Sequence, residues 1–379
     1  MLGLSPARTE RRRSLPDLWF SIRDPVLSSP RFQRWAARFP LTRFVAQRRA
    51  AALFDLCAGF VYSQVLHATV RLGLLELLAE EPRTIAELAL CLDLSAEATE
   101  RLLEAATSLK LVHRRGQGRY GLGRHGAALM GNPAVKRMVM HHELLYRDLA
   151  SPVALLRGDG PPTELRRFWS YVDATATSSV TEVAGYSELM AGSLSLIAED
   201  ILEAYPPRHH RRLLDVGGGE GAFLEAAAAS SPELSLVLFD LPAVAERARA
   251  RLTRAGLASR STIVGGSVFE DALPEGADLV SLVRIIHDHD DPEALRILRA
   301  IRAVLKPGGV LLVAEPMSGT PGAQPMGEAY FGFYLLAMGQ GRPRTPKQLS
   351  SLLLAAGFDR VRVVRTRRPM LTGLLVAEV

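Results

Sequence analysis

Two hydrophobic patterns divide this chain into halves of different character. Between residues 50 and 131, apolar side chains such as Leu53, Leu56 and Phe60 recur at the spacing of one helix face. From residue 213 onward, short continuous apolar runs alternate with helix-like segments, as in a parallel sheet covered by helices. The pattern therefore predicts a helical N-terminal half followed by an α/β half.

The helical half ends in the pattern of a winged helix. Residues 84–87 read Thr-Ile-Ala-Glu, a capping box that starts one helix, and a further helix over residues 96–109 follows the cap Ser95. Residues 111–113 and 120–122 are β-like and flank a glycine-containing tip, which predicts a hairpin. Helices followed by such a hairpin are typical of a winged-helix domain.

Apolar runs in the second half predict strands. They lie at residues 213–216, 236–239, 279–283, 310–314, 361–366 and 373–379. The segment between residues 138 and 204 is helix-like and connects the two halves, with a Gly- and Pro-rich loop at 158–162.

A glycine-rich turn follows the first of these strands. Residues 215–221 read Asp-Val-Gly-Gly-Gly-Glu-Gly, and glycines without Cβ atoms let a ligand approach the backbone and the next helix N-terminus. The third glycine comes one place earlier than in G-x-G-x-x-G dinucleotide loops. Asp240 closes the next strand, where a carboxylate can accept both hydroxyls of a ribose. A nucleoside ligand is predicted; the alternative is a purely structural turn.

Histidine and acidic side chains cluster after the strand at 279–283. His287, Asp288 and His289 follow that strand at the carboxyl edge of the sheet, where ligands bind in open α/β folds. Histidine is the side chain best suited to proton removal near neutral pH, so His287 is a candidate general base. A metal site is the alternative for this cluster, and we expect none.

Composition and charge narrow the class of protein. The chain has 379 residues, 48% of them hydrophobic, which suits two domains. Its two cysteines, Cys57 and Cys91, lie in helix-like patterns, so a disulfide framework is not expected. No stretch suggests a membrane-spanning helix and the arginine-broken N-terminus lacks the apolar centre of a signal peptide, so we expect a cytoplasmic protein.

The positive charge is concentrated at the N-terminus. Residues 1–50 hold eleven arginines and three acidic residues, a net charge of +8 against +6 for the whole chain. Aromatic residues, among them Trp19, Trp35 and Phe39, alternate with these arginines, as in a basic amphipathic segment on a membrane surface. The alternative is that the aromatics pack on the protein's own helices or on a partner subunit.

A winged helix also raises the possibility of a DNA-binding regulator. The helix that would enter DNA carries Glu97, Glu100 and Glu104 against Arg101 and Lys110. This charge would repel phosphates rather than neutralise them. We therefore expect no nucleic-acid partner, and DNA binding remains a remote alternative.

The glycine loop D-x-G-x-G-x-G and the acid at Asp240 resemble class I S-adenosylmethionine-dependent methyltransferases. With the helical half and the His287 motif, residues 50–379 resemble the caffeate and hydroxyindole type of O-methyltransferase. The resemblance implies a Rossmann-like seven-stranded domain after an all-α, winged-helix dimerisation domain, S-adenosyl-L-methionine as cofactor, and a homodimer. It implies four segments: an arm (1–49), the dimerisation domain (50–135), a helical connector (136–204) and the catalytic domain (205–379).

The resemblance also assigns site residues. The catalytic pair is His287, the general base, and Glu315, the acid that holds it. The cofactor-binding residues are Asp215, Gly217, Gly219, Gly221, Asp240, Leu241, Ser267, Val268, Phe269 and Arg284. The substrate residues lie on one helical face and are Tyr330, Phe333, Tyr334 and Met338. Such a face is also typical of the hydrophobic core of a protein. As the wall of a substrate pocket, its apolar character would suit a large apolar substrate.

Two positions depart from the family pattern. The second acid that precedes an Arg-Thr pair in plant relatives is replaced by Pro343, before Arg344 and Thr345. A Gly-Asp pair near the adenine pocket is replaced by Gly266 and Ser267.

The segments 30–42 and 53–64 narrow the resemblance further. They are similar to the bacterial O-methyltransferases of carotenoid biosynthesis that act on hydroxyneurosporene or demethylspheroidene in purple phototrophs. That likeness implies methylation of a tertiary C1 hydroxyl on an apolar acyclic carotenoid, with peripheral contact of residues 1–49 at the cytoplasmic face of a membrane. The alternative is C- or O-methylation of a tetrapyrrole pigment or a phenolic secondary metabolite.

Overall fold

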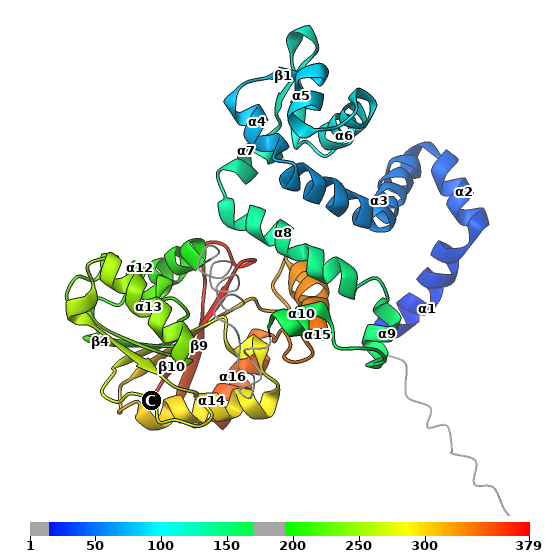
Figure 1. Ribbon diagram of the computed structural model, residues 1–379. Helices are drawn as coiled ribbons and strands as arrows, with labels where there is room; N and C mark the ends of the chain where they lie inside the picture. The colour runs from blue at the N-terminus through cyan, green and yellow to red at the C-terminus, as the bar shows by residue number, and fades with distance from the viewer. Residues whose placement is uncertain (1–14, 170–193) are drawn as a thin grey trace, which may run out of the picture. The chain divides into compact units, whose positions relative to one another are not determined.

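A computed structural model describes residues 15–169 and 194–379. The chain forms two compact units, residues 1–126 and 127–379. Figure 1 labels many of the elements of both units. The finer division into four segments stays a prediction.

The first unit begins with three helices that start at or next to prolines. These are α1 (Leu15–Ser28), α2 (Pro30–Arg38) and α3 (Pro40–Arg71). Pro30 and Pro40 each occupy the first turn of a helix, where a missing N–H costs nothing. Along α1, α2 and the first half of α3, most aromatic and aliphatic side chains are exposed within this unit.

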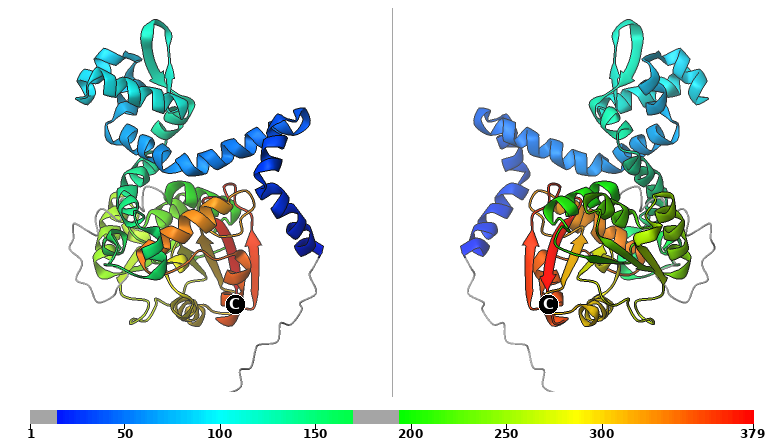
Figure 2. Two further views of the ribbon diagram at one scale, coloured as in Figure 1. Left: turned by 90° about the vertical axis from the view of Figure 1, so that its right-hand side faces the viewer. Right: turned by 90° about the vertical axis from the view of Figure 1, so that its left-hand side faces the viewer.

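The rest of the first unit is the predicted winged helix. It contains α4 (Leu74–Glu80), β1 (Arg83–Thr84), α5 (Ile85–Leu92), α6 (Ala96–Ser108), β2 (Val112–Arg114), η1 (Gly116–Gly118) and β3 (Arg119–Leu122), and it ends within α7 (Arg124–Met130). Both predicted caps are present, because Thr84 and Glu87 bond reciprocally and Ser95 accepts from the Ala98 N–H. The hairpin of β2 and β3 projects beyond the helices of its own unit (Figure 2). β1 pairs with β3 as a third strand, which the sequence did not predict because β1 is only two residues long.

α3 corrects one expectation. By length and composition alone this helix could cross a membrane, and 6% of its most apolar window is buried. The sequence of α3 contains no continuous apolar run of that length, because its apolar residues alternate with Asp55, two glutamines and four arginines.

The second unit is built on a seven-stranded mixed sheet, as predicted. The strand order is β6-β5-β4-β7-β8-β10-β9. The strands are β4 (Arg212–Val216), β5 (Ser235–Asp240), β6 (Ser261–Gly265), β7 (Leu279–Val283), β8 (Val310–Glu315), β9 (Arg360–Val364) and β10 (Gly373–Glu378). Neighbours from β6 to β8 run parallel, and β10 pairs antiparallel with β8 and β9.

Helices bury both faces of this sheet. Residues 194–204, α12 (Ala222–Ser230) and α13 (Pro242–Arg254) pack on one face, and α14 (Asp291–Val304) and α16 (Pro346–Ala355) on the other (Figure 1). Leu214, Val280 and Leu311 are fully buried, as expected for parallel strands covered on both sides. This sandwich places the carboxyl ends of β4, β5 and β7 at one edge.

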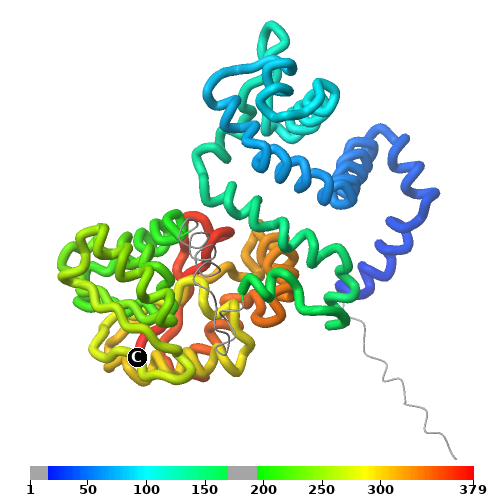
Figure 3. The backbone as a smooth tube through the Cα atoms, in the orientation of Figure 1, coloured from blue at the N-terminus to red at the C-terminus, as the bar shows by residue number. Residues whose placement is uncertain are grey.

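The remaining helices of the second unit form a separate cluster. α8 (Pro133–Asp148), α9 (Pro152–Arg157), α10 (Glu164–Phe168) and α15 (Gly332–Met338) pack through Leu145, Leu165, Trp169 and Tyr334. The tube in Figure 3 shows how the chain leaves α8, forms the sheet and returns to this cluster through α15.

Candidate functional site

The glycine loop lies between β4 and α12, at the carboxyl edge of the sheet. Gly217 has a φ of +68° and its absent Cβ would collide with the Ile285 side chain. Gly219 has a φ of +58°, and an added Cβ there would meet no atom within 4 Å. The Gly219 N–H donates to Oδ2 of Asp240 over 2.7 Å, which ties the loop to the end of β5. The loop therefore combines open backbone with a fixed carboxylate.

Asp240 is partly buried at the end of β5. Its Oδ1 accepts the Leu241 N–H over 2.7 Å, and burial raises the pKa of this carboxyl to about 6 against the two backbone hydrogen bonds that lower it. Each carboxylate oxygen has a second lone pair that can accept a hydroxyl hydrogen. The side chain is therefore arranged to bind a diol such as ribose.

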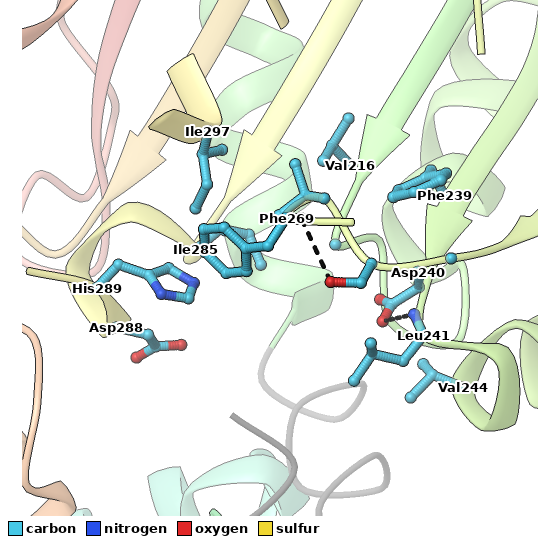
Figure 4. Close-up of a pocket in the computed structure, with 14 residues that line it drawn as sticks. Val216, Phe239, Asp240, Leu241, Val244, Phe269, Ile285, Asp288, His289 and Ile297 are labelled. Carbon is cyan, nitrogen blue, oxygen red and sulfur yellow. Dashed lines mark hydrogen bonds between the residues drawn. The ribbon is translucent and has the colours of Figure 1, made fainter. Parts of the chain in front are cut away.

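A pocket opens beside this carboxylate. Its walls come from the ends of four strands and the loops that follow them, and the lining residues are Val216, Gly217, Phe239, Asp240, Leu241, Val244, Gly266, Ser267, Val268, Phe269, Ile285, Asp288, His289 and Ile297. Figure 4 shows Asp240, Leu241 and Val244 at one end, Asp288 and His289 at the other, and Phe269 and Ile285 between them. Apolar walls with a polar group at each end suit a nucleoside joined to a charged chain.

Six predicted cofactor residues line this pocket: Gly217, Asp240, Leu241, Ser267, Val268 and Phe269. The Ser267 hydroxyl accepts the Phe269 N–H over 3.3 Å, and the Ser267 N–H donates to Asp271 over 2.9 Å. The serine that replaces the family's acid thus shapes the loop, and a carboxylate four residues later holds it.

The other four predicted cofactor residues are not among the lining residues. Gly219 and Gly221 belong to the glycine loop but do not line the pocket. Arg284 lies on the turn after β7 with a φ of +60°. Asp215 is buried, accepts the Ser281 hydroxyl over 2.6 Å, and leaves Oδ2 without a partner among the described residues. Burial, opposed by the Ser281 bond and assisted by Asp240, raises the pKa of Asp215 to about 7.

His287 lies on the short helix η4 (Ile286–Asp288), directly after β7. Its ring is buried between two carboxylates. Nδ1 bonds to Oε2 of Glu315 from the end of β8, and Nε2 lies 3.1 Å from Oδ1 of Asp288. The other Glu315 oxygen accepts the N–H groups of Ile285 and Ile286 over 3.0 and 2.7 Å. Glu315 therefore fixes both the imidazole and the turn that carries it.

Burial and the nearby carboxylates shift the pKa of His287 in opposite directions. Burial is the largest single effect and lowers the pKa, and the positive charge of Arg284 lowers it further. Asp288 and Glu315 together outweigh both, so the pKa is raised overall. For Asp288, burial is the largest effect and raises the pKa of the carboxyl, although the nearby His287 and His289 act to lower it. For His289, burial dominates and the pKa falls. An imidazole between two carboxylates is stabilised in its protonated form.

Sequence reasoning missed Asp288 as a partner of His287. It identified Pro343 in place of a second acid and found no substitute, whereas the structure brings a second carboxylate to His287 from the next residue in the chain. The direction in which Asp288 turns depends on η4, which the sequence does not specify.

The predicted substrate helix is interrupted. Residues Pro325–Phe331 form the π-helix η5, and α15 continues from Gly332. Widened turns of this kind occur often at functional sites. Phe331, the last residue of η5, lies beside His287, with ring centroids 6.1 Å apart. Phe331 was not among the predicted substrate residues, because position 331 is not on the helical face that Tyr330, Phe333, Tyr334 and Met338 share.

Two histidines from α8 reach the same helix. His141 Nε2 lies 2.7 Å from the Tyr334 hydroxyl and His142 Nε2 lies 2.8 Å from the Tyr330 hydroxyl. The Trp169 N–H also donates to Tyr334 over 3.1 Å. Burial, with a smaller effect of His142, lowers the pKa of His141 to about 4, so this ring is neutral. Sequence reasoning missed both histidines, since 193 and 188 residues separate His141 and His142 from their partners.

The tyrosine hydroxyls are thus engaged within the protein. Tyr330 and Tyr334 turn their polar ends toward α8, with Met338 buried beside Tyr334 in the same cluster. Phe333 is half-buried and belongs to α15. Among residues 15–169 and 194–379, no group of three or more metal-ligating side chains is arranged to hold a metal ion.

Comparison with known proteins identifies relatives of both units. An O-methyltransferase domain model matches residues 146–359 and an O-methyltransferase dimerisation domain model matches residues 54–132. The chain is 46% identical to demethylspheroidene O-methyltransferase of Cereibacter sphaeroides over 93% of each chain. The enzyme of the same name from Rhodobacter capsulatus is 41% identical, over 93% of this chain and 88% of the other.

Solved structures show the same fold. Human N-acetylserotonin methyltransferase in complex with S-adenosylmethionine superposes with a TM-score of 0.72 at 26% identity, over 87% of this chain and 97% of that one.

Proposed function

Because this chain belongs to the O-methyltransferase family and takes S-adenosylmethionine as its methyl donor, we propose that its acceptor is the tertiary C1 hydroxyl of an apolar acyclic carotenoid. One observation carries this choice of substrate. Two relatives named demethylspheroidene O-methyltransferase match nearly the whole chain at 46% and 41% identity, whereas acetylserotonin and phenazine enzymes match at 29–32%.

The residues beside His287 support an apolar acceptor. The aromatic rings of Phe331, Tyr330 and Tyr334 follow one another at centroid distances of 5.1 and 5.8 Å. Since His141 and His142 occupy the tyrosine hydroxyls, the half-buried rings of Tyr330 and Phe331 remain to contact a substrate, while the ring of Tyr334 is itself buried. A polyene gains from contact with such rings, whereas a polar phenolic acid would leave its own groups unpaired.

The proposed chemistry assigns two residues. The bound cofactor supplies an electrophilic methyl group on a sulfonium. On transfer of that methyl group to the acceptor oxygen, His287 would take the hydroxyl proton at Nε2, while Glu315 would hold the ring through Nδ1. A tertiary alcohol is too weak an acid for an imidazole to ionise beforehand. Most of the rate therefore comes from alignment of oxygen, methyl and sulfur.

The cofactor fits the residues present. Asp240 is placed to accept ribose hydroxyls, and the collision that a Cβ at Gly217 would cause shows how closely the loop packs beneath the pocket. Val268 and Phe269 offer apolar contacts for the adenine, on the loop after β6.

The dimerisation domain supports a homodimer. In the described part of the first unit, Leu53, Phe54, Leu56 and Phe60 are at least 63% exposed. Burial of such side chains against a second copy would contribute about 1.5–3 kcal/mol each. The same match favours a subunit interface over a DNA-binding role for the winged helix, in line with its acidic helix.

We further propose that the protein is cytoplasmic and touches the membrane surface through residues 1–49. This arm precedes both family matches. On α2, Trp35 stacks on Phe39 with centroids 5.1 Å apart, and both are at least 40% exposed. A shallow hollow there is lined by Arg31, Arg34, Trp35, Arg38, Phe39 and Pro40. Exposed aromatics among arginines match an anionic headgroup layer.

Vesicle sedimentation tests the arm. The full chain should pellet with phosphatidylglycerol-containing vesicles, less with phosphatidylcholine vesicles, and less again at 0.5 M salt. Changing Arg31, Arg34 and Arg38 to Gln should abolish pelleting, whereas Arg101→Gln with Arg114→Gln, on the winged helix, should not. If the arm variant pellets normally but becomes monomeric, the arm belongs to the subunit interface and the membrane proposal is wrong.

Methyl transfer from labelled S-adenosylmethionine tests the acceptor. Demethylspheroidene in detergent should give a labelled methyl ether, and N-acetylserotonin and a tetrapyrrole pigment should give rates lower by at least about tenfold. A product labelled on carbon, or faster turnover of the phenol or tetrapyrrole, would replace the carotenoid as acceptor while leaving the cofactor and fold unchanged.

A further inference from the structure

Arg344 is a buried cation close to the turn that carries His287. Its side chain is 1% exposed, and it lies between α15 and α16, directly after the proline that replaces the family's second acid. Burying a guanidinium is unfavourable unless all its donors are engaged. The partners of Arg344 therefore indicate why a charge is kept there.

Those partners all belong to the segment after β7. Nη1 donates to the Ile286 carbonyl over 2.7 Å and Nη2 to the His289 carbonyl over 2.7 Å. Nε and Nη2 both donate to Oδ1 of Asp291, over 2.9 and 2.8 Å. One planar side chain thus binds both ends of η4 and the start of α14.

Neighbouring backbone extends the same contact. The Arg342 N–H donates to the His287 carbonyl over 2.9 Å, and the Gly341 N–H to Oδ1 of Asp290 over 3.2 Å. The carbonyl side of η4 is therefore held by residues 341–344, while its N–H side is held by Glu315. His287 lies between these two attachments.

We infer that Arg344 is a positioning residue for His287, whose guanidinium fixes η4 so that the imidazole stays between Glu315 and Asp288. In this chain the segment around Pro343 acts on the proposed base through backbone contacts rather than through a carboxylate. The inference rests on the proposed role of His287, but its test measures the environment of the imidazole directly.

The charged groups that face His287 make the test specific. Three charged groups shift the pKa of His287: Asp288 and Arg284 on its own turn, and Glu315 from β8. His289 is a second imidazole on the same segment. Phe331, which packs against His287 from η5, is uncharged. Loosening η4 should move the carboxylates away and lower the pKa of His287. Loss of a nearby positive charge alone would raise that pKa. The two effects have opposite signs.

Arg344→Lys keeps the charge and removes the planar fork. Carbon-13 labelling of histidine Cε1, with His287 assigned by a His287→Gln variant, allows its titration to be followed by NMR in the full-length protein without any substrate. We expect the His287 midpoint to fall by at least about half a pH unit in Arg344→Lys. Arg342→Lys, whose half-exposed side chain bonds only Asp291 in the described chain, should leave it unchanged.

Asp291→Asn provides a second variant should Arg344→Lys fail to fold. Asp291 is half-exposed and is not among the charges that shift the pKa of His287, so any shift must act through the arginines that Asp291 bonds, Arg344 and Arg342, which Arg342→Lys separates. The midpoint should again fall, by less. With methyl transfer as an added readout, kcat should drop about tenfold or more in Arg344→Lys and stay within about twofold in Arg362→Lys, at a half-exposed side chain on β9.

Unchanged His287 titration in Arg344→Lys and Asp291→Asn would overturn the inference, even if both variants were less stable. If the titration shifts but His287→Gln retains full methyl-transfer activity, Arg344 still positions the ring and the proposed base is wrong. The two failures are therefore distinguishable.

Discussion

His287 Nε2 lies 3.1 Å from Oδ1 of Asp288, while its other ring nitrogen faces Glu315. A neutral imidazole has one N–H and an imidazolium has two, so only the protonated ring can donate to both carboxylates. The site is thus arranged for the state in which His287 has received a proton. An acceptor hydroxyl that hydrogen-bonds to Nε2 therefore competes with Asp288 for this nitrogen.

Asp288→Asn tests this arrangement. Without the carboxylate, the pKa of His287 should fall, because the charge of Asp288 is the largest single effect that raises it. Since the proposed active form is the neutral imidazole, methyl transfer in the natural protein should rise with pH through a midpoint above the ordinary 6.5, and the variant's midpoint should move to lower pH. Single-turnover rates between pH 5 and 9 measure both, and equal midpoints would contradict the assignment.

His287→Ala separates proton removal from cofactor binding. General-base catalysis typically contributes about 10²–10⁴-fold, so turnover should fall by about a hundredfold or more. His287 is not among the residues that line the cofactor pocket, and calorimetry should find S-adenosylmethionine affinity within about threefold. His209→Ala, at an exposed histidine, is the matched control. Undiminished turnover in His287→Ala would leave proton removal to another group.

Some of this site could be predicted because its signals are local. The glycine loop, Asp240 and His287 each follow an apolar run, and the carboxyl ends of parallel strands meet at one edge of the sheet. The capping box at Thr84 depends on four successive residues. Such features need only the neighbouring sequence to be recognised.

The rest depended on distant partners or on a change of helical period. His142 meets Tyr330 across 188 residues, and nothing near either position indicates the other. The sequence does not indicate that residues 325–331 form a π-helix, and the regular helical face that it predicts does not include Phe331, which lies beside His287. Arg344 was noted only as part of a motif lacking its acid, because its role depends on carbonyls more than fifty residues away.

Cofactor binding should depend on pH through Asp240. The pKa of this carboxyl is about 6, so below that pH it is increasingly protonated and one of its acceptor sites becomes a donor. S-adenosylmethionine affinity should be constant above about pH 7 and fall by up to about tenfold per pH unit well below 6. Asp240→Asn should lower affinity about 10- to 100-fold and remove most of this dependence. Glu246→Gln, on the exposed side of α13, should change neither.

Calorimetric titrations at pH 5, 6, 7 and 8 provide the measurement. Asp215, with a pKa of about 7, is coupled to Asp240, so the observed midpoint belongs to the pair. The pH dependence that survives in Asp240→Asn is the part due to Asp215. Affinity that is flat from pH 5 to 8 in the natural protein would show that Asp240 does not bind the ribose as its carboxylate.

Gly217 and Gly219 form a matched pair for the close packing of the loop. Both have positive φ, so alanine at either position costs about 1–2 kcal/mol of backbone strain. Only at Gly217 would the new methyl group also collide with Ile285, on the turn before His287. Overpacking of this kind costs about 1–3 kcal/mol more. Gly217→Ala should therefore lower the free energy of unfolding by more than Gly219→Ala does, as measured by urea denaturation of the dimer at fixed concentration. Gly217→Ala should also reduce kcat, because the displaced Ile285 precedes η4. Equal losses of unfolding free energy in the two variants would show that the loop adjusts without displacing that turn.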